Sequence, residues 1–282
     1  MGNMVNNDHL ARFKGKKVAV TGDTGFKGSW LALWLTMCGA EVLGYSLPPL
    51  HEMDHYNLIG LSRMIRHVDG DVRDHGRLTE GLQDFDPEII FHLAAQALVR
   101  RSYSEPKYTF DTNVGGFINL LEVSRTLPGL RSLICVTSDK CYLNKEWMWG
   151  YRESDELGGK DPYSASKAAA EMVFMGYMHA FFAGRKDVGI ASVRAVNVIG
   201  GGDWSEDRIV PDTIKALQKG EAIVLRNPAS TRPWQHVLEP LGGYILLAAK
   251  LYESPRDYSG SWNFGPDKSA INTVQDLAER II

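Results

Sequence analysis

Cysteine is scarce in this sequence, and long apolar runs are missing from it. The three cysteines, Cys38, Cys135 and Cys141, form no CxxC pair, which argues against a disulfide framework and for a reducing compartment. No stretch approaches the roughly 18 consecutive apolar residues that span a bilayer. Residues 1–16 are polar and contain no apolar core, so we expect no secretory signal. We therefore expect a cytoplasmic protein with no membrane partner.

Neither sign of charge is in large excess. The formal net charge is −3 and no local run is basic, so we expect neither nucleic acid nor an anionic membrane as a partner. Apolar residues make up 44% of the chain and charged residues 23%, which is ordinary for a soluble globular protein. A chain of 282 residues accommodates one large α/β domain, or a main domain with a smaller lobe.

The sequence does contain a regular alternation of strand-like and helix-like segments. We predict strands at 17–21, 41–45, 65–68, 88–92 and 133–137, and helices at 26–37, 76–83 and 108–124. Strands that alternate with helices predict a parallel sheet covered on both faces, that is, a Rossmann-like, doubly wound α/β fold. In such a fold the ligand binds at the carboxyl ends of the strands.

A glycine-rich turn follows the first predicted strand. Its sequence, Gly22-Asp23-Thr24-Gly25-Phe26-Lys27-Gly28, has GxxGxxG spacing and opens a helix. Glycines let the backbone approach a pyrophosphate closely, and the N–H groups at the start of the helix bind its charge. Glycine-rich loops also serve as plain tight turns. The position between the first strand and the first helix favours dinucleotide binding.

The ends of the next strands are less decisive. The acidic residue that usually follows the second strand and binds the ribose is missing, because Tyr45-Ser46 occupies that place. No arginine lies close enough to indicate NADP instead. Asp71, which precedes Val72 after the third strand, either accepts a hydrogen bond from an adenine amino group or lies in a solvated turn. The fourth strand is followed by a segment whose small residues admit a flat ring or a backbone: Leu93, Ala94, Ala95 and Gln96.

Candidate catalytic residues follow the fifth strand. Ser138 lies at its end, and Tyr163 and Lys167 are four residues apart on a predicted helix, which places them on one face. An ammonium lowers the pKa of a neighbouring phenol and can also hold a ribose hydroxyl. Such a tyrosine can take the proton of a sugar hydroxyl while hydride leaves the carbon for nicotinamide. A YxxxK pattern alone is common by chance, but the glycine-rich turn and Ser138 make a merely solvated helix face the poorer interpretation.

Several longer stretches carry a resemblance to a known family. They are TGDTGFKGSWL at 21–31, TSDKCY at 137–142, EWMWGYRE at 146–153, YSASK at 163–167, NVIGGGDW at 197–204, RPWQHV at 232–237 and WNFGP at 262–266. The chain resembles the extended short-chain dehydrogenases/reductases, and within them the nucleotide-sugar 4,6-dehydratases that act on CDP-glucose. The resemblance implies NAD as cofactor and a nucleotide-diphosphate hexose, CDP-glucose first, as substrate.

The resemblance also implies an internal redox cycle. Tyr163 removes the O4 proton as hydride passes from C4 to NAD, water is lost across C5 and C6, and the same hydride returns to C6. Asp139, when protonated, delivers a proton to the departing O6. Lys140 lies where the C5 base is expected, a role that requires a neutral amine. A turn ion pair between Asp139 and Lys140 is the alternative interpretation.

Binding residues are likewise implied by the resemblance. Asn197, Arg208 and Arg232 meet the nucleotide's sugar, diphosphate and base, and Asn113 braces the active site. Asp23 stands where the family usually has histidine, which puts a carboxylate near the cofactor diphosphate unless Lys27 or the helix end offsets it. We expect no metal site. The expected cofactor-binding set is Gly22, Thr24, Gly25, Phe26, Lys27, Gly28, Asp71, Val72, Leu93, Ala94, Ala95, Gln96, Asn113, Tyr163 and Lys167.

The family analogy divides the chain into an NAD-binding Rossmann domain at 1–190 and a part at 191–282 that is mainly a smaller nucleotide-sugar-binding lobe, interleaved with it. The chain stops inside a predicted helix at 274–282, where relatives continue, so we expect the lobe to be incomplete. A homodimer through the helices around 108–124 and 163–182 is also implied, as are products used for deoxysugars of bacterial surface polysaccharides, such as lipopolysaccharide O-antigen.

Other functions stay open at this point. A nucleotide-sugar 4-epimerase or reductase would share Ser138, Tyr163 and Lys167 but needs no acid at Asp139. A dehydratase for another nucleotide-hexose would keep the whole mechanism. A non-catalytic dinucleotide-binding protein could use the same fold, because fold alone does not decide function.

Overall fold

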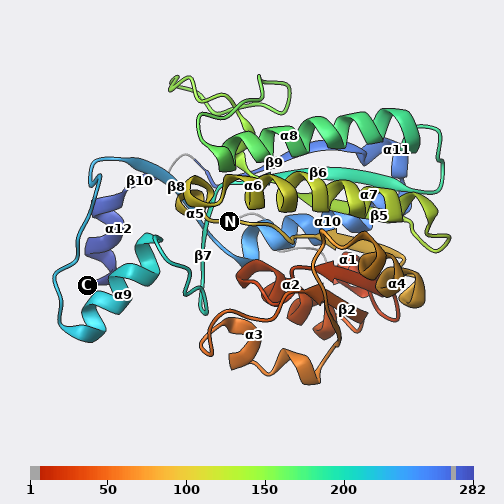
Figure 1. The fold of residues 1–282 in the computed structure, drawn as a ribbon, viewed down its shortest axis with the longest axis horizontal. Helices are drawn as coiled ribbons and strands as arrows, with labels where there is room; N and C mark the ends of the chain where they lie inside the picture. Colours follow the sequence, from red (N-terminus) through yellow and green to blue (C-terminus); the bar gives the residue numbers. More distant parts are fainter. Residues whose placement is uncertain (1–6, 268–270) are drawn as a thin grey trace.

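A seven-stranded parallel sheet forms the centre of the computed structural model, which describes residues 7–267 and 271–282. Its strand order is β3-β2-β1-β4-β5-β6-β9, and every neighbouring pair is parallel. The chain starts in the middle of the sheet and winds outward in both directions, which confirms the predicted doubly wound fold (Figure 1). The strands are β1 (Lys17–Thr21), β2 (Glu41–Ser46), β3 (Arg66–Asp69), β4 (Ile89–His92), β5 (Ser132–Val136), β6 (Gly189–Ala195) and β9 (Gly260–Phe264).

Helices cover both faces of this sheet. Side chains alternate along a strand, so Val18 and Val20 of β1 pack in one core cluster, with Leu35, while Ala19 packs in the other, with Leu82. The helices of the first face are α1 (Asn7–Ala11), α2 (Phe26–Met37) and α10 (Leu238–Glu253). Those of the second face are α4 (His75–Phe85), α6 (Pro106–Phe110), α7 (Phe117–Thr126) and α8 (Pro162–Tyr177).

The single helix predicted at 108–124 is interrupted. Between α6 and α7 the chain forms a π-helical turn, η2 (Asp111–Gly116), and α8 continues into a second one, η4 (Met178–Phe182). A π-turn inserts an extra residue into the helical ladder and often lies at a functional site. Here it carries Asn113, which is buried. Apolar periodicity does not reveal such an insertion, because helix continues on both sides of it.

A smaller lobe lies beside the carboxyl ends of the strands (Figure 1, left). Its sheet has the order β10-β8-β7, from β7 (Asn197–Ile199), β8 (Thr231–His236) and β10 (Ile271–Thr273), with α9 (Ile209–Lys219) packed against α12 (Val274–Ile281). The same part of the sequence also contributes β6 and β9 to the large sheet and α10 to one of its faces. The expected division at residue 190 therefore falls inside β6.

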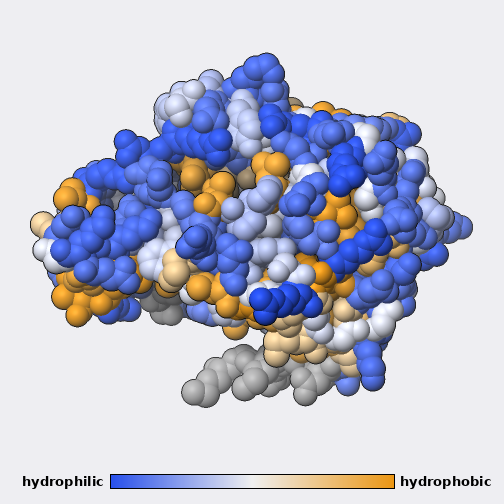
Figure 2. Space-filling model, turned by 60° about the horizontal axis from the view of Figure 1, so that its bottom comes forward, coloured by the Kyte–Doolittle hydropathy of each residue, from blue (hydrophilic) through white to orange (hydrophobic). Residues whose placement is uncertain are grey.

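Short elements complete the chain: α3 (His55–Leu58), η1 (Leu61–Arg63), α5 (Val99–Ser104), η3 (Asp139–Cys141) and α11 (Pro255–Tyr258). Figure 2 shows a face that is mostly hydrophilic, with hydrophobic residues in separate patches, one of them on the lobe. Exposed apolar side chains of the lobe include Leu217, Val224 and Ile282. None of the helices in the described ranges is both long and apolar enough to cross a membrane.

Candidate active site

The glycine-rich turn packs directly against the end of β4. Gly22 has φ +78°, and a Cβ there would lie 2.7 Å from the backbone nitrogen of Ala94. A Cβ on Gly28 would lie 2.0 Å from the carbonyl oxygen of Gly22, so α2 can approach the turn only with glycine at this position. α2 begins at Phe26 with no side-chain cap, which leaves the N-terminal N–H groups and the positive end of its dipole for an anion. This geometry fits the pyrophosphate of a dinucleotide.

Tyr163, the expected catalytic tyrosine, is fixed by the start of α8. Asp161 caps this helix by accepting a hydrogen bond from the backbone N–H of Ser164 at 2.9 Å, and the backbone N–H of Tyr163 donates to Ser102 Oγ at 3.1 Å. The Tyr163 hydroxyl is hydrogen-bonded with Ser138, and Ser138 Oγ donates to Asp139 Oδ1 at 3.0 Å. The structure thus brings Ser138, Asp139 and Tyr163 together.

Burial decides the protonation of the ionisable groups here. It raises the pKa of Tyr163 to about 12, against the opposing effect of the Ser138 hydrogen bond. Burial and the charge of Lys27 lower the pKa of Lys167 to about 8. Burial and the charge of Arg208 lower that of Lys27 to about 8 as well. The expected net lowering of the pKa of Tyr163 is not found, because removing the phenolate from water outweighs the surrounding positive charge.

Lys140 points toward Tyr163. Its Nζ lies 5.8 Å from the centroid of the Tyr163 ring, whereas no ion pair with Asp139 forms in the part of the chain that the structure describes. The Lys140 side chain is exposed. Exposure does not supply the desolvation that a neutral amine would need, so the structure supports the placement of Lys140 but not its activation.

Asn113 joins the end of β4 to α8. Its Oδ1 accepts from the backbone N–H of Gln96 at 2.8 Å, and its Nδ2 donates to the Gln96 carbonyl at 3.0 Å and to Ser166 Oγ at 2.9 Å. The amide of Gln96 in turn bonds with Leu98 and Thr109. Both side-chain amides are therefore committed within the protein, and they hold the backbone of 93–96 in place.

Asp71 and Val72 were expected on the adenosine side of the cofactor, and Asp23 beside its diphosphate. Asp71 accepts from both the backbone and the guanidinium of Arg73, and the side chain of Val72 packs in the core. The carboxylate of Asp23 is buried and bonded to Ser46 and His67. A buried hydroxyl and an imidazole are thus the partners of Asp23 within the protein, rather than Lys27.

The expected substrate residues are only partly brought together. Arg208 Nη1 bonds Asp203 Oδ2 at 2.7 Å, and its charge acts on both Tyr163 and Lys27. Asn197 begins β7, opposite Trp234 of β8. Arg232 is exposed on β8, where its guanidinium bonds the carbonyl of Thr231, and no contact joins it to the catalytic residues among those described.

Two tryptophans of the lobe carry buried donors. The indole N–H groups of Trp204 and Trp234 have no hydrogen-bond partner within residues 7–267 and 271–282. A buried polar group without a partner costs free energy, which a ligand carrying acceptor oxygens would offset. These residues belong to the NVIGGGDW and RPWQHV stretches singled out in the sequence.

A buried ion pair behind the site was not anticipated. Glu171 Oε2 accepts from Arg194 Nη2 at 2.6 Å, and the hydroxyl of Thr137 also donates to Glu171. A signal was available in the sequence, since Glu171 follows Lys167 by one helical turn and Arg194 is the lone charge of the apolar strand GIASVRA. The ion pair ties α8 to β6, and the hydrogen bond from Thr137 ties α8 to the end of β5.

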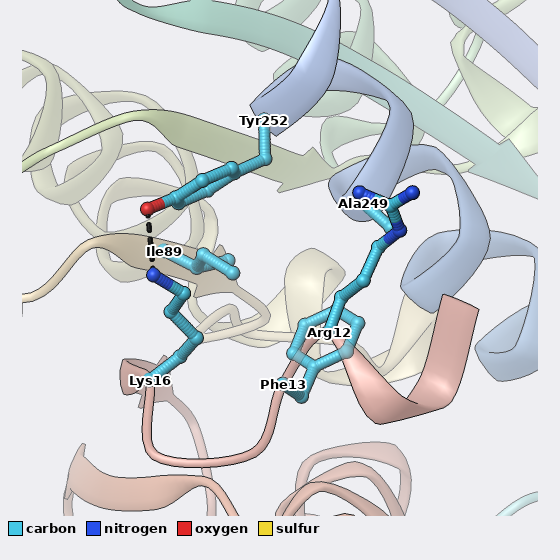
Figure 3. A pocket seen from close by; sticks show the side chains of 6 residues that line it. All are labelled: Arg12, Phe13, Lys16, Ile89, Ala249 and Tyr252. Atoms are coloured by element: carbon cyan, nitrogen blue, oxygen red, sulfur yellow. Dashed lines mark hydrogen bonds between the residues drawn. The ribbon is translucent and has the colours of Figure 1, made fainter. Parts of the chain in front are cut away.

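Two cavities lie at opposite ends of the large sheet. A small one at the carboxyl ends of the strands is lined by His92, Ala94, Asn113, Phe117, Cys135, Val136, Thr137, Lys167 and Ala170. A larger one, of about 130 Å³, lies beside Lys16 at the amino end of β1 and is lined by Arg12, Phe13, Lys16, Ile89, Ala249 and Tyr252 (Figure 3). Lys16 there already bonds Tyr252 and Glu88. The larger cavity is thus remote from the chemistry. No cluster of His, Cys, Asp or Glu in the described residues could hold a metal ion.

Comparisons with known proteins agree with this geometry. Residues 19–261 match the model of the family described as GDP-mannose 4,6 dehydratase. The chain is 46% identical over 274 residues to a CDP-glucose 4,6-dehydratase of Salmonella typhimurium, covering 96% of this chain and 76% of the relative. It is 30% identical over 184 residues to a UDP-glucose 4-epimerase of Mycolicibacterium smegmatis, covering 65% of this chain and 56% of that protein.

Solved structures share the fold. A UDP-glucose 4-epimerase of Thermotoga maritima, in complex with UDP-glucose, superposes with a TM-score of 0.79 at 22% identity, covering 93% of this chain and 80% of the other. A double mutant of a dTDP-glucose 4,6-dehydratase of Streptomyces venezuelae, with NAD bound, superposes with a TM-score of 0.78 at 24% identity, covering 94% and 79%. At these identities the likeness concerns the fold alone.

Proposed function

The chain belongs to the nucleotide-sugar 4,6-dehydratase family of the extended short-chain dehydrogenases/reductases, and from this membership we propose that it converts CDP-D-glucose into CDP-4-dehydro-6-deoxy-D-glucose and water with bound NAD. One observation carries the proposal: Asp139 lies beside Ser138 and Tyr163. Oxidation at C4 needs a base, whereas elimination of water also needs an acid near the leaving hydroxyl. Asp139 supplies that acid.

The glycine-rich turn at residues 22–28 would hold NAD, which would supply the group that takes up hydride from C4 of the hexose and gives it back at C6. Tyr163 takes the proton of the O4 hydroxyl, with Ser138 sharing its hydrogen bond. Because burial raises the pKa of Tyr163 to about 12, this proton transfer depends on nearby positive charge, which Lys167 on the same face of α8 supports. The 4-ketone then makes the C5 hydrogen acidic, and loss of that hydrogen expels O6 with the proton of Asp139.

Lys140 is the residue we propose for removal of the C5 proton. Its placement over the Tyr163 ring supports this role, and closure of the substrate over its exposed side chain would supply the desolvation that the amine requires. Exchange of the C5 hydrogen with deuterium from solvent measures this step directly. If Lys140→Ala retained normal exchange, another residue would be the base.

The lobe is the part that we propose binds the nucleotide. The charge of Arg208 acts to lower the pKa of Tyr163, so Arg208 lies near the proposed catalytic residues. A guanidinium suits a diphosphate because its planar fork makes paired, charge-assisted hydrogen bonds. Asn197 and Arg232 complete the proposed substrate set on β7 and β8, with the indole N–H groups of Trp204 and Trp234 as further donors.

A product assay tests the proposed function. The purified chain is incubated with NAD and, separately, CDP-, dTDP- and UDP-glucose and GDP-mannose, and the alkaline absorbance of a 4-keto-6-deoxy sugar is followed. Signal with CDP-glucose alone supports both reaction and substrate. Signal with another nucleotide keeps the reaction and changes the substrate. Conversion to a C4 epimer without loss of water identifies an epimerase instead.

We also propose a homodimer that works in the cytoplasm. Helices α6 and α8, together with η4 after α8, expose several large apolar side chains, and a second copy of the chain would cover them: Phe110, Met172, Met175 and Phe181. The free thiols of Cys38, Cys135 and Cys141 support a reducing compartment. The product would enter deoxysugar synthesis for surface polysaccharides. Sedimentation of the purified chain as a monomer would overturn the dimer.

A further inference from the structure

The second strand ends without the acid that dinucleotide folds usually place there. In such folds an aspartate or glutamate about 20 residues after the glycine-rich turn accepts a hydrogen bond from the ribose 2′-hydroxyl. β2 ends instead at Ser46, which pairs with Asp69 of β3. Ser46 is 6% exposed, and its hydroxyl is the polar side-chain group that β2 offers at this end.

A carboxylate reaches the same place from a different part of the chain. Asp23, the second residue of the glycine-rich turn, is completely buried. Its Oδ1 accepts a hydrogen bond from Ser46 Oγ at 2.9 Å, and its Oδ2 lies 2.7 Å from Nδ1 of His67. A Cβ on Gly44 would lie 2.1 Å from Oδ2, so glycine at this point of β2 makes the room that Asp23 occupies.

The partner of Asp23 connects it to the surface. His67 is 15% exposed and its Nε2 lies 3.2 Å from Asp69, which is itself 72% exposed. The His67 ring also packs beside Tyr56, with centroids 5.7 Å apart. Since a buried carboxylate is stable only when it is hydrogen-bonded or paired, Ser46 and His67 together keep Asp23 in this position.

This arrangement fixes the direction in which the Ser46 proton points. Ser46 Oγ lies within reach of three acceptors, Asp23 Oδ1 at 2.9 Å, Thr24 Oγ1 at 2.9 Å and the Leu47 carbonyl at 3.1 Å. The Leu47 carbonyl already accepts from Thr24 Oγ1 at 2.8 Å, and a hydrogen bond to a charged acceptor is the stronger one. The proton therefore goes to Asp23. The oxygen of Ser46 accepts from the backbone N–H of Thr24 at 3.4 Å, and its second lone pair is left as an acceptor.

We propose that Asp23, acting through Ser46, makes the site select the 2′-hydroxyl of NAD over the 2′-phosphate of NADP. A ribose hydroxyl can donate its proton to Ser46 Oγ. A phosphate at the same place has only acceptor oxygens, so it has no proton to donate to Ser46 Oγ. It is also repelled by the negative charge of Asp23 directly behind Ser46. Asp23 thus does indirectly what a β2-terminal acid does by direct contact. The inference rests on the proposed function in taking the glycine-rich turn as the NAD site.

Equilibrium titration of the chain with NAD and with NADP, followed by tryptophan fluorescence, tests this selection. In Asp23→Asn the new amide donates to Ser46, whose own proton is then free to meet a phosphate. We expect the ratio of the association constant for NAD to that for NADP to fall about tenfold or more. A tenfold fall corresponds to about 1.4 kcal/mol of binding free energy. An unchanged ratio in a variant that unfolds at the wild-type midpoint overturns the inference.

Two further variants decide the matter even if Asp23→Asn does not fold. Ser46→Ala removes the oxygen that would accept from the ribose hydroxyl but keeps the negative charge of Asp23. NAD binding should therefore weaken while NADP binding stays weak. His67→Gln keeps a donor toward Asp23, so selection of NAD should persist. If His67→Gln lost the selection of NAD over NADP while Ser46→Ala kept it, the cluster of Asp23, Ser46 and His67 would act only on folding. That result would overturn the inference.

The same titrations separate failure of the inference from failure of the proposed function. A wild-type chain that binds neither dinucleotide overturns both. A wild-type chain that binds NAD and turns over a nucleotide sugar, while Asp23→Asn and Ser46→Ala keep the wild-type ratio, overturns the inference alone.

Discussion

Glu171 and Arg194 form a buried ion pair, with Oε2 of Glu171 2.6 Å from Nη2 of Arg194 and side chains that are 0% and 1% exposed. The pair joins helix α8 to strand β6. Glu171 extends the α8 face that carries Tyr163 and Lys167, and it also accepts from Ser192 on β6. The other end of the guanidinium donates to the Tyr142 hydroxyl and to the carbonyl of Glu153, which ties the loop after η3 to the sheet.

Breaking this pair should cost much of the stability of the chain. Glu171→Gln leaves the Arg194 charge buried without a counter-charge, and such losses amount to about 3–5 kcal/mol. Denaturant unfolding measures the change. Glu122→Gln is the matched control, because its ion pair with Arg125 is on the surface and should contribute about 1 kcal/mol or less. Equal effects of the two variants would contradict a special role for the buried pair.

Tyr163→Phe should slow turnover strongly and spare cofactor binding. The variant keeps the ring and loses the proton acceptor, so kcat should fall by about 10²- to 10⁴-fold, while the affinity for NAD in a titration changes little. Tyr177→Phe is the control on the same helix, since its hydroxyl bonds Glu122 rather than Ser138. Full activity in Tyr163→Phe would remove this tyrosine from the mechanism.

Asp139→Asn should separate oxidation from elimination. The amide cannot give a proton to the leaving O6, so formation of the 4-keto-6-deoxy product should fall by about 10²-fold or more, whereas oxidation of the hexose at C4 continues. Rapid-quench analysis of the sugar in a single turnover distinguishes the 4-keto hexose from the 4-keto-6-deoxy hexose. Normal elimination in this variant would favour an epimerase-like use of the site.

Lys167 should make the cofactor-free chain less stable near neutral pH. Its pKa is lowered to about 8 from an ordinary value of 10.5, so the unfolded chain binds more protons between these values and stability rises with pH across that window. Lys167→Met should raise the free energy of unfolding at pH 7 by about 1–3 kcal/mol and abolish activity. Lys186→Met, on the exposed surface, should change neither.

His67 should stabilise the fold most at low pH. Burial lowers the pKa of His67, but the hydrogen bonds and charges of Asp23 and Asp69 outweigh burial and raise it above 6.5. A raised histidine pKa gives stability that is fully present below the ordinary value and is lost as pH rises through the raised one. The free-energy difference between wild type and His67→Gln should therefore shrink from about pH 5 to about pH 9. A difference independent of pH would refute the charged pair, and exposed His75→Gln is the control.

Much of the fold could be predicted because it depends on spacing along the chain. The alternation of strands and helices predicted the doubly wound parallel sheet, and the predicted β1 (Lys17–Thr21) and α2 (Phe26–Met37) match the observed bounds. The predicted helix at 108–124 missed the π-turn at Asn113, since an inserted residue leaves the apolar pattern nearly unchanged.

The candidate site divides in the same way. Ser138 and Tyr163 were expected to meet because strand ends and the helix start converge in this fold, and the structure brings them together. The partners of Asp23 could not be read from its neighbours in sequence, because Ser46 and His67 lie 23 and 44 residues away.

The sequence by itself determined the sheet, the glycine-rich turn and the common face of Tyr163 and Lys167, because backbone periodicity and steric limits act over a few residues. Only the tertiary structure decided where the buried charges go. Asp23 turns to His67 and Glu171 to Arg194 because a carboxylate withdrawn from water takes whichever donors packing places beside it. Contacts between elements that are distant in the sequence cannot be predicted from the spacing of neighbouring residues.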